Sequence, residues 1–243
     1  MEIIRKHFET IDSTNNWCKS NCHLLDPNTL TLVTAASQTK GRGRLKKEWV
    51  SPLNENIYAT FCFDFDSKRK DLGNIPQVLA LSTVAILKKL HFSPQLKWPN
   101  DILLSNKKVS GILCETVSLE NHFMVILGIG LNINMPLKTL QKIDKPATSL
   151  KEEAGQEFEI EAILNLLQEQ FQKDLELFLK KGFGLFLEEY KKIAWTNEGK
   201  KIRFHDNLKI IEGFFHSIND EGALNLIVEG HIKTFISGEF LIN

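Results

Sequence analysis

Residues 123–133, FMVILGIGLNI, form a run that is apolar at almost every position. Such a run predicts a strand that is buried on both faces and is therefore central in its sheet. Other runs rich in β-branched or alternating apolar residues predict further strands, at residues 29–36, 56–65, 95–98, 101–104 and 109–117. The polar residues 105–108 between the last two runs predict a hairpin turn. The chain must therefore fold around a sheet.

Amphipathic segments predict the helices that cover this sheet. Apolar residues recur at helical spacing over residues 74–90 and over residues 159–179, which is typical of helices lying on a sheet. The segment Asp12–Asn15 offers several N-cap side chains for a short helix that reaches about Cys22. Residues 183–194 predict a further helix. Because the strands stand in runs instead of alternating one by one with helices, the predicted fold class is α+β.

The sequence changes character after residue 197. Residues 201–243 contain short alternating strands, separated by turn-forming residues at Asp206-Asn207, Asn219–Gly222 and Glu229-Gly230. This pattern predicts a small antiparallel β-barrel. We therefore expect two domains, a large one over residues 1–197 and a small one over residues 198–243.

Composition and charge argue against several classes of protein. Lysine plus arginine number 30, and so do aspartate plus glutamate, so no global positive field would draw the chain to nucleic acid or to a membrane. No apolar run reaches the roughly 18 residues of a spanning helix, and the N-terminus has no apolar signal core. The four cysteines show no paired zinc spacing. We expect a cytoplasmic protein with reduced thiols.

A loop that alternates glycine with arginine stands at residues 41–49, GRGRLKKEW. Glycine lets the backbone bend closely round a ligand, and the guanidinium groups of arginine suit phosphate oxygens. The same residues also fit a solvated basic loop or a nucleic-acid patch. The balanced net charge weakens the nucleic-acid interpretation.

Two further segments place polar side chains where strands end or begin. In KWPND, residues 97–101, Pro99 interrupts the strand ladder, so Asn100 and Asp101 would be displayed and could hold hydrated Mg²⁺ or phosphates. A plain Pro-Asn-Asp turn beside a packed tryptophan would explain the same residues. In KKVSGIL, residues 107–113, a lysine three residues before a glycine could place a cation over a close-lying ligand. Alternatively, that lysine only confers solubility.

The glycines of residues 128–134, GIGLNIN, do not make a dinucleotide fingerprint, because the third glycine and a following helix are missing. They instead indicate a backbone that lies against something flat. Asn132 and Asn134 face one side of the strand. The sequence contains no phosphate-loop, GxSxG or HExxH motif, and its histidines are scattered without ligand spacing.

These segments, in this order, resemble the biotin protein ligases over most of the chain. The matching segments are Ser13-Thr14-Asn15, Gln38, GRGRLKKEW, KWPND, KxxGIL, GIGxNxN, Ala147–Leu150 and Ser237-Gly238-Glu239. GRGR, KWPND and KxxGIL together form a very specific signature. The resemblance implies a mixed-sheet catalytic domain of the biotin/lipoate ligase type, residues 1–197, followed by a small C-terminal antiparallel β-barrel domain, residues 198–243.

The resemblance also implies roles for individual residues. Those that would bind biotin are Ser13, Thr14, Asn15, Gln38, Arg42, Gly43, Arg44, Lys108, Gly111 and Leu113. Those that would bind ATP or the adenylate are Trp49, Lys97, Asn100, Asp101 and Asn132. Lys108 and Arg44 would be catalytic, and Mg²⁺ would be held near Asn100 and Asp101 through the phosphates. Lys46 and Lys47 depart from the family loop, which usually has glycine and arginine there.

The implied function is an ATP-dependent ligation in two steps. Biotin and ATP, with Mg²⁺, would give biotinyl-5'-AMP, and biotin would then pass to a specific lysine of a biotin carboxyl carrier domain. Because the similarity starts at about residue 10, we expect the catalytic-only type without an N-terminal DNA-binding domain. We therefore expect neither DNA nor a membrane as a partner, and the sequence leaves a homodimer open.

Two rival functions stay open from the sequence. A lipoate–protein ligase resembles this family in fold and performs the same two steps, but its dithiolane ligand needs no polar cradle. Binding of biotin but not of lipoate would separate the two. A non-enzymatic RNA-binding protein could use the basic loop and the C-terminal barrel, although the balanced charge and the lack of an aromatic platform argue against it. Salt-dependent affinity for RNA without ATP–pyrophosphate exchange would support it.

Overall fold

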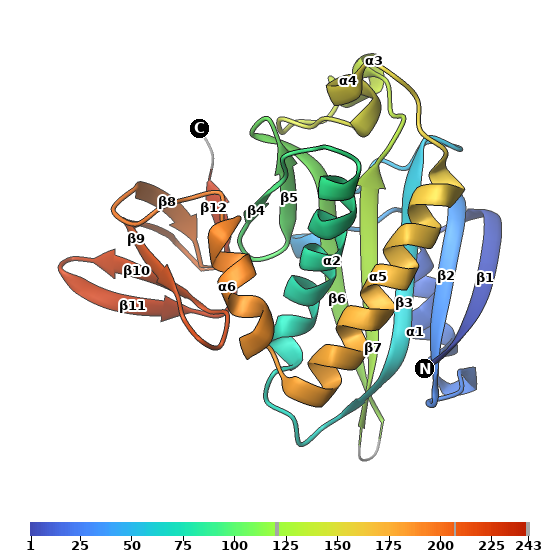
Figure 1. Cartoon of the computed structure of the whole chain (residues 1–243), viewed down its shortest axis with the longest axis horizontal. Helices are drawn as coiled ribbons and strands as arrows, with labels where there is room; N and C mark the ends of the chain where they lie inside the picture. Colours follow the sequence, from blue (N-terminus) through green and yellow to red (C-terminus); the bar gives the residue numbers. More distant parts are fainter. Residues whose placement is uncertain (120–121, 207, 242–243) are drawn as a thin grey trace.

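The computed structural model describes residues 1–119, 122–206 and 208–241. Its strands form two sheets (Figure 1). The larger sheet has seven strands in the order β1-β2-β3-β7-β6-β5-β4, and it is mixed because β1 and β2 are parallel. Its strands are β1 (Glu2–Ile11), β2 (Thr29–Gln38), β3 (Asn56–Asp66), β4 (Gln95–Lys97), β5 (Asp101–Leu104), β6 (Lys107–Leu119) and β7 (His122–Asn132).

Helices lie on both faces of the larger sheet. The long helices α2 and α5 run across one face, and α1 lies behind the sheet in this view (Figure 1). The helices are α1 (Thr14–Asn21), α2 (Ile75–Lys89), α3 (Leu137–Leu140), α4 (Leu150–Ala154), α5 (Ile160–Lys181) and α6 (Gly184–Lys192). Short 3-10 turns lie at Cys22–Leu24, Arg44–Lys46 and Leu72–Asn74.

The apolar strand β7 occupies the middle of the seven-stranded sheet, between β3 and β6, as its composition predicted. Its side chains alternate between two apolar layers. Val125 and Leu127 belong to the main core with α2 and α5. Met124 and Ile126 belong to a smaller cluster with Cys18 of α1. Both faces of the strand are therefore covered, which explains why no polar alternation appears in its sequence.

The two long helices follow the predicted apolar spacing. One stripe of α5 is buried, consisting of Ile163, Leu164, Leu167, Phe171, Leu175 and Phe178. The Phe171 ring lies 4.6 Å from the ring of Phe61 on β3, measured between centroids. The α+β prediction is thus confirmed, as is the hairpin between β5 and β6, whose two turn residues Ser105 and Asn106 have positive φ.

The edge strand β1 was missed by the sequence analysis. Most of its residues are exposed, so neither an apolar run nor a clean alternation marks it. It pairs in parallel with β2. Arg5 also donates hydrogen bonds to Glu161, Gln168 and Asn165 of α5. Its place in the fold therefore depends on partners far away along the chain.

The C-terminal strands form the small antiparallel unit that was predicted, as an open sheet and not as a closed barrel. Their order is β11-β10-β9-β8-β12, all neighbours are antiparallel, and the first and last strands do not pair with each other. The strands are β8 (Lys201–His205), β9 (Ile210–Ile218), β10 (Leu224–Val228), β11 (His231–Phe235) and β12 (Glu239–Leu241). The edge strand β12 is only three residues long.

The smaller sheet shares a core with the rest of the chain. Trp98 packs against Phe204 and Phe240, with centroids 6.0 and 6.3 Å apart, and its indole N–H donates to the carbonyl oxygen of Gly222 at 3.0 Å. The division at residue 197 therefore stays a prediction. Across the described residues, none of the helices has the length and apolar character needed to span a membrane.

Candidate active site

A pocket of about 530 Å³ opens above β6 and β7, which is a volume typical of small-molecule sites. Its wall is built from the start of α1, the loop after β2, the turn between β4 and β5, residues 142–147, and Glu239 of β12. Every residue assigned to biotin, ATP or catalysis from the sequence lines this one pocket. The structure therefore brings these residues together, and their individual roles stay predictions.

One end of the pocket is a neutral polar surface around the start of α1. The side-chain oxygen of Gln38 accepts hydrogen bonds from the backbone N–H and the hydroxyl of Thr14, at 2.9 and 3.2 Å. The hydroxyl of Thr60 contacts the hydroxyl of Thr14 and the amide oxygen of Asn15, at 2.8 and 2.7 Å. The hydroxyl of Ser13 accepts from the backbone N–H of Asn16 and so caps the helix. These side chains are held in place before a ligand arrives.

The glycine-rich loop folds back on itself above this surface. The backbone N–H of Trp49 donates to the carbonyl of Gly41 at 3.0 Å, and that of Gly43 donates to the carbonyl of Lys47 at 2.7 Å. An isolated β-bridge joins Arg42 and Glu48 between these two bonds. The loop thus forms a small hairpin whose two arms are residues 41–43 and residues 47–49. A contact that holds one arm therefore also positions the other.

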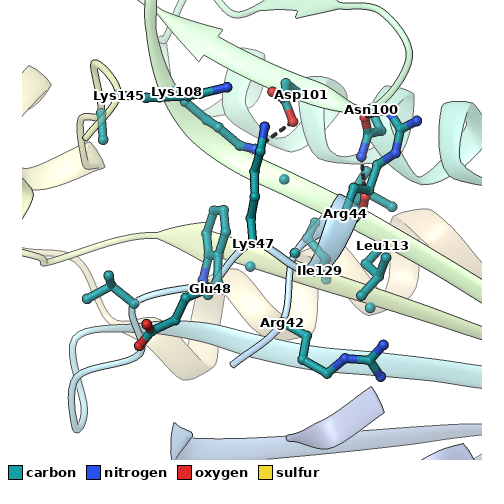
Figure 2. Close-up of a pocket in the computed structure, with 18 of the residues that line it drawn as sticks. Arg42, Arg44, Lys47, Glu48, Asn100, Asp101, Lys108, Leu113, Ile129 and Lys145 are labelled. Atoms are coloured by element: carbon teal, nitrogen blue, oxygen red, sulfur yellow. Dashed lines mark hydrogen bonds and ion pairs between the residues drawn. The ribbon is translucent and has the colours of Figure 1, made fainter. Parts of the chain in front are cut away.

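The two arginines of the loop point to different partners (Figure 2). The guanidinium of Arg42 donates to both carboxylate oxygens of Glu115, at 3.0 and 3.1 Å. That of Arg44 donates to the side-chain oxygen of Asn100 at 3.0 Å and to the carbonyl of Gly238 at 3.2 Å. Burial lowers the pKa of Arg44, although Asp101 and Glu239 act in the opposite direction.

The other end of the pocket is strongly charged. The ammonium of Lys108 lies 2.6 Å from the carboxylate of Asp101. Lys97 is only 6% exposed, and this burial lowers its pKa against the opposing effect of Asp101 and Glu239. Together with Arg44, these cations surround the space where an anion would be stabilised most strongly.

Glu239 ties the C-terminal sheet to this cation cluster. Its carboxylate accepts from Lys47 at 2.5 Å and from Lys145. Burial raises the pKa of Glu239, but the hydrogen bonds from Lys145 and Lys47 outweigh it and bring the value down to about 2. Glu239 is therefore an internal anion that holds two lysines of the pocket wall.

Neutralising Glu239 should weaken the attachment of the C-terminal sheet. Because the folded-state pKa is lowered, its stabilising effect is present above the ordinary value of 4.5 and is lost as the pH falls towards 2. We expect Glu239→Gln to lower the free energy of unfolding by roughly 1–2 kcal/mol at pH 7, after discounting for the exposed lysines. The difference from wild type should shrink below pH 4. Urea unfolding at both pH values measures it, and an equal difference at both would contradict the ion-pair explanation.

Gly130 of β7 and Gly111 of β6 lie under the indole of Trp49, and the sequence had predicted a flat neighbour for the glycines of β7. A Cβ on Gly130 would overlap the indole ring, and one on Gly111 would lie 3.1 Å from it. The ammonium of Lys108 is 5.3 Å from the ring centroid. Trp49 thus lies flat on the pocket floor, next to the charged end.

Two buried polar atoms in this part of the pocket lack a hydrogen-bond partner among the described residues. They are the indole nitrogen of Trp49, a donor, and the side-chain oxygen of Asn132, an acceptor. The amide nitrogen of Asn132 donates to the carbonyl of Thr148 at 3.0 Å, which fixes the direction of the free oxygen. Buried polar atoms are normally paired, so this pair indicates a ligand that offers both a donor and an acceptor.

Several pocket features were not found from the sequence. Thr60, Glu115 and Lys145 were not singled out, and Glu239 entered only as part of a resemblance. Alternation along β6 could have signalled Glu115, because it shares a strand face with Gly111 and Leu113. The partners of Lys145 and Glu239 lie too far apart in sequence for any local pattern to join them.

A metal site of protein side chains alone is not formed. Within the described residues, no group of three histidine, cysteine, aspartate or glutamate side chains is placed to hold a metal ion. The side-chain oxygen of Asn100 accepts from Arg44, and its amide nitrogen donates to the carbonyl of Ile112. Any ion here would need oxygen ligands from a substrate in addition to Asp101.

Fold and pocket together define the class of protein. The structure matches the biotin protein ligase from Aquifex aeolicus in complex with biotin and ATP, with a TM-score of 0.80 and 28% identity, over 99% of this chain and 97% of that chain. Residues 7–132 match the sequence profile of the biotin/lipoate A/B protein ligase family. The chain belongs to this family.

Curated relatives extend beyond the chain. The bifunctional ligase/repressor BirA of Bacillus subtilis is 30% identical over 219 residues, which are 86% of this chain and 65% of the relative. Biotin–protein ligase 2 of Arabidopsis thaliana is 29% identical over 178 residues, 68% of this chain and 51% of the relative. The chain thus spans 65% and 51% of the lengths of these two relatives.

Proposed function

We propose that this chain is a biotin–protein ligase that forms biotinyl-5'-AMP from biotin and ATP and transfers biotin to a lysine of a biotin carboxyl carrier domain. The observation that carries the proposal is a single pocket with two chemically different ends. One end is neutral and polar, and the other is rich in cations. Biotin and ATP need these two environments side by side, because the biotin carboxylate must reach the α-phosphorus of ATP.

The neutral end suits the ureido ring of biotin. That ring presents two N–H donors and one carbonyl acceptor. Thr14, Asn15 and Gln38 supply hydroxyl and amide groups, which can both accept and donate hydrogen bonds. Hydrogen bonds between Thr14 and Gln38, and between Thr60 and Asn15, hold them in one arrangement, so little rearrangement is needed on binding. Gly128 leaves room above β7, since a Cβ there would overlap the amide of Asn15.

The charged end suits two anions that must approach each other. The biotin carboxylate attacks the α-phosphorus of ATP, the mixed anhydride forms, and pyrophosphate leaves. Arg44, Lys97 and Lys108 surround this space and would stabilise the negative charge that develops on the phosphoryl oxygens. A neutral lysine amine of the acceptor then attacks the acyl carbon, and AMP leaves. The loop that carries Trp49 would keep water away from the anhydride.

The donor set fits Mg²⁺ that enters with ATP. Mg²⁺ usually takes one or two carboxylates together with substrate phosphates, and Asp101 supplies a carboxylate at the charged end. Mg²⁺ would neutralise phosphate charge there. Asn100 would act mainly by orienting Arg44, because its oxygen already accepts from that guanidinium.

The free oxygen of Asn132 fits the amino group of adenine. We expect Asn132→Leu to raise the KM for ATP about 5- to 10-fold, the effect of one lost hydrogen bond, and to change the KM for biotin less than 2-fold. Steady-state pyrophosphate exchange measures both constants. Asn134→Leu is the matched control, because the side chain of Asn134 exchanges hydrogen bonds with the backbone of Phe158 and does not line the pocket. Equal effects on the KM for ATP and the KM for biotin would contradict the assignment of adenine to Asn132.

The acceptor and the location follow from the same proposal. A biotin carboxyl carrier domain supplies the lysine, and a cytoplasmic location supplies ATP. The four cysteines of the chain are all free, in keeping with a reducing compartment. A lipoate–protein ligase stays the alternative, and the hydrogen-bonding groups around Thr14 favour biotin, since a dithiolane ring cannot use them.

Biotin-dependent ATP–pyrophosphate exchange on the purified chain tests the proposal. We expect exchange with biotin and none with lipoate, followed by labelling of a carrier domain. Exchange that depends on lipoate would establish the alternative. Salt-dependent RNA binding without any exchange would point to the non-enzymatic function.

A further inference from the structure

Glu115 joins three parts of the biotin end of the pocket without lining the pocket itself. It stands on β6 two residues after Leu113, and alternation along the strand places both side chains on the same face. Its partner on β7 is Ile126, which packs in the apolar cluster with α1. The carboxylate therefore lies between the pocket floor and the first turn of α1.

The carboxylate of Glu115 is fully engaged. One oxygen accepts from Arg42 at 3.0 Å and faces the ammonium of Lys19 at 3.5 Å. The other accepts from Arg42 at 3.1 Å and from the amide of Asn15 at 3.3 Å. The side chain is 17% exposed. Burial raises the pKa of Glu115, but the bonds from Asn15 and Arg42 outweigh it, so the pKa is lowered.

We propose that Glu115 is a positioning residue of the biotin site, which holds the Arg42 arm of the loop and the Asn15 amide of α1 in their binding arrangement. Both atoms of that amide are held in place, because the oxygen contacts Thr60 and the nitrogen donates to the carbonyl of Leu113 as well as to Glu115. The oxygen keeps a second lone pair for a ligand. This assignment rests on the proposed function, since it names biotin as the ligand of this end.

The loop transmits the effect of Glu115 beyond Arg42. The bridge between Arg42 and Glu48 and the bond between Gly41 and Trp49 join the two arms. An anchor at Arg42 therefore also restrains the indole that lies on Gly130. Without the anchor, the loop would have to be ordered by the ligand itself, and part of the binding free energy would be lost to that ordering.

Glu115→Gln tests the assignment because it keeps the shape of the side chain and removes its charge. We expect affinity for biotin alone to fall about 10-fold, while kcat for exchange at saturating ligands stays within 2-fold. In the ligand-free protein, trypsin should cleave the loop several-fold faster. Glu161→Gln is the matched control, because Glu161 also pairs with an arginine, Arg5 at 2.9 Å, far from the pocket. It should leave both measurements unchanged.

A double-mutant cycle separates positioning from a general loss of stability. In an Arg42→Met background, Glu115→Gln should have little further effect on biotin affinity or on cleavage of the loop. Wild-type affinity and wild-type cleavage in Glu115→Gln would overturn the proposal, and so would an undiminished effect in the Arg42→Met background. Should Glu115→Gln fail to fold, Arg42→Met alone tests the same contact from the exposed loop. If the wild-type chain binds no biotin, the proposed function fails, and the trypsin comparison still decides whether Glu115 anchors the loop.

Discussion

Replacing Lys108 with alanine should slow formation of biotinyl-5'-AMP by about 10²–10³-fold, the usual effect of removing a group aimed at developing transition-state charge. Lys108 is well placed for this role, because its ammonium lies at the charged end of the pocket, 2.6 Å from Asp101 and 5.3 Å from the ring centroid of Trp49. A bound phosphate would compete with Asp101 for that ammonium. Biotin-dependent pyrophosphate exchange measures the rate.

Lys107→Ala is the control for this substitution. Lys107 is the neighbouring residue on β6, it is exposed, and it does not line the pocket. It should keep a nearly wild-type rate, because it cannot reach the reacting groups. A rate within a few-fold of wild type in Lys108→Ala would remove this lysine from the first step and would leave Arg44 and Lys97 as the cations that carry it.

Local sequence patterns predicted the layers of the fold because local physics determines them. The uniform apolar run of β7 requires cover on both faces, and the apolar stripe of α5 requires a sheet to lie on. The edge strand β1 could not be found in this way. Its exposed side chains carry no periodicity, and its order depends on β2 and on Arg5, whose partners lie more than 150 residues away on α5.

The contents of the pocket could be predicted from motifs, but the contacts that hold it could not. GRGR and KWPND indicated a ligand site, and the structure places Arg44 against Asn100. Glycines in β7 indicated a flat neighbour, which is Trp49 for Gly130 and the amide of Asn15 for Gly128. The anchors are single residues, Glu115 and Glu239, and an isolated glutamate in a strand looks like any solvated charge. Their partners are identified by the tertiary fold, because those partners lie far away along the chain.

The open form of the small C-terminal sheet could not be predicted for a related reason. Alternating short strands specify an antiparallel sheet, but closure into a barrel depends on the tilt and stagger of all its strands. Here β12 has three residues, and its Glu239 is used to hold Lys47 and Lys145. The end of the small sheet therefore serves the pocket instead of closing a barrel.

Arg44→Gly should separate the two half-reactions. Arg44 is held in place by Asn100 and Gly238, at 3.0 and 3.2 Å, so its guanidinium can retain an adenylate phosphate without reorganising. If its role is retention, adenylation should still proceed on Lys108 and Mg²⁺, and the intermediate should escape. One lost charge-assisted hydrogen bond is worth roughly 1.5–3 kcal/mol, or about 10- to 150-fold in retention.

Escaped adenylate is a reactive acyl donor, so the Arg44→Gly protein should place biotin on exposed lysines of bystander proteins. A blot for biotin on an added non-acceptor protein compares it with wild type. Lys40→Gly is the control, because it adds a glycine to the same loop at an exposed position that does not line the pocket. If Arg44→Gly forms no adenylate, this arginine serves the first step. If adenylate forms and no extra label appears, retention depends on other groups, and Lys97 becomes the first candidate because it is a buried cation of the same cluster.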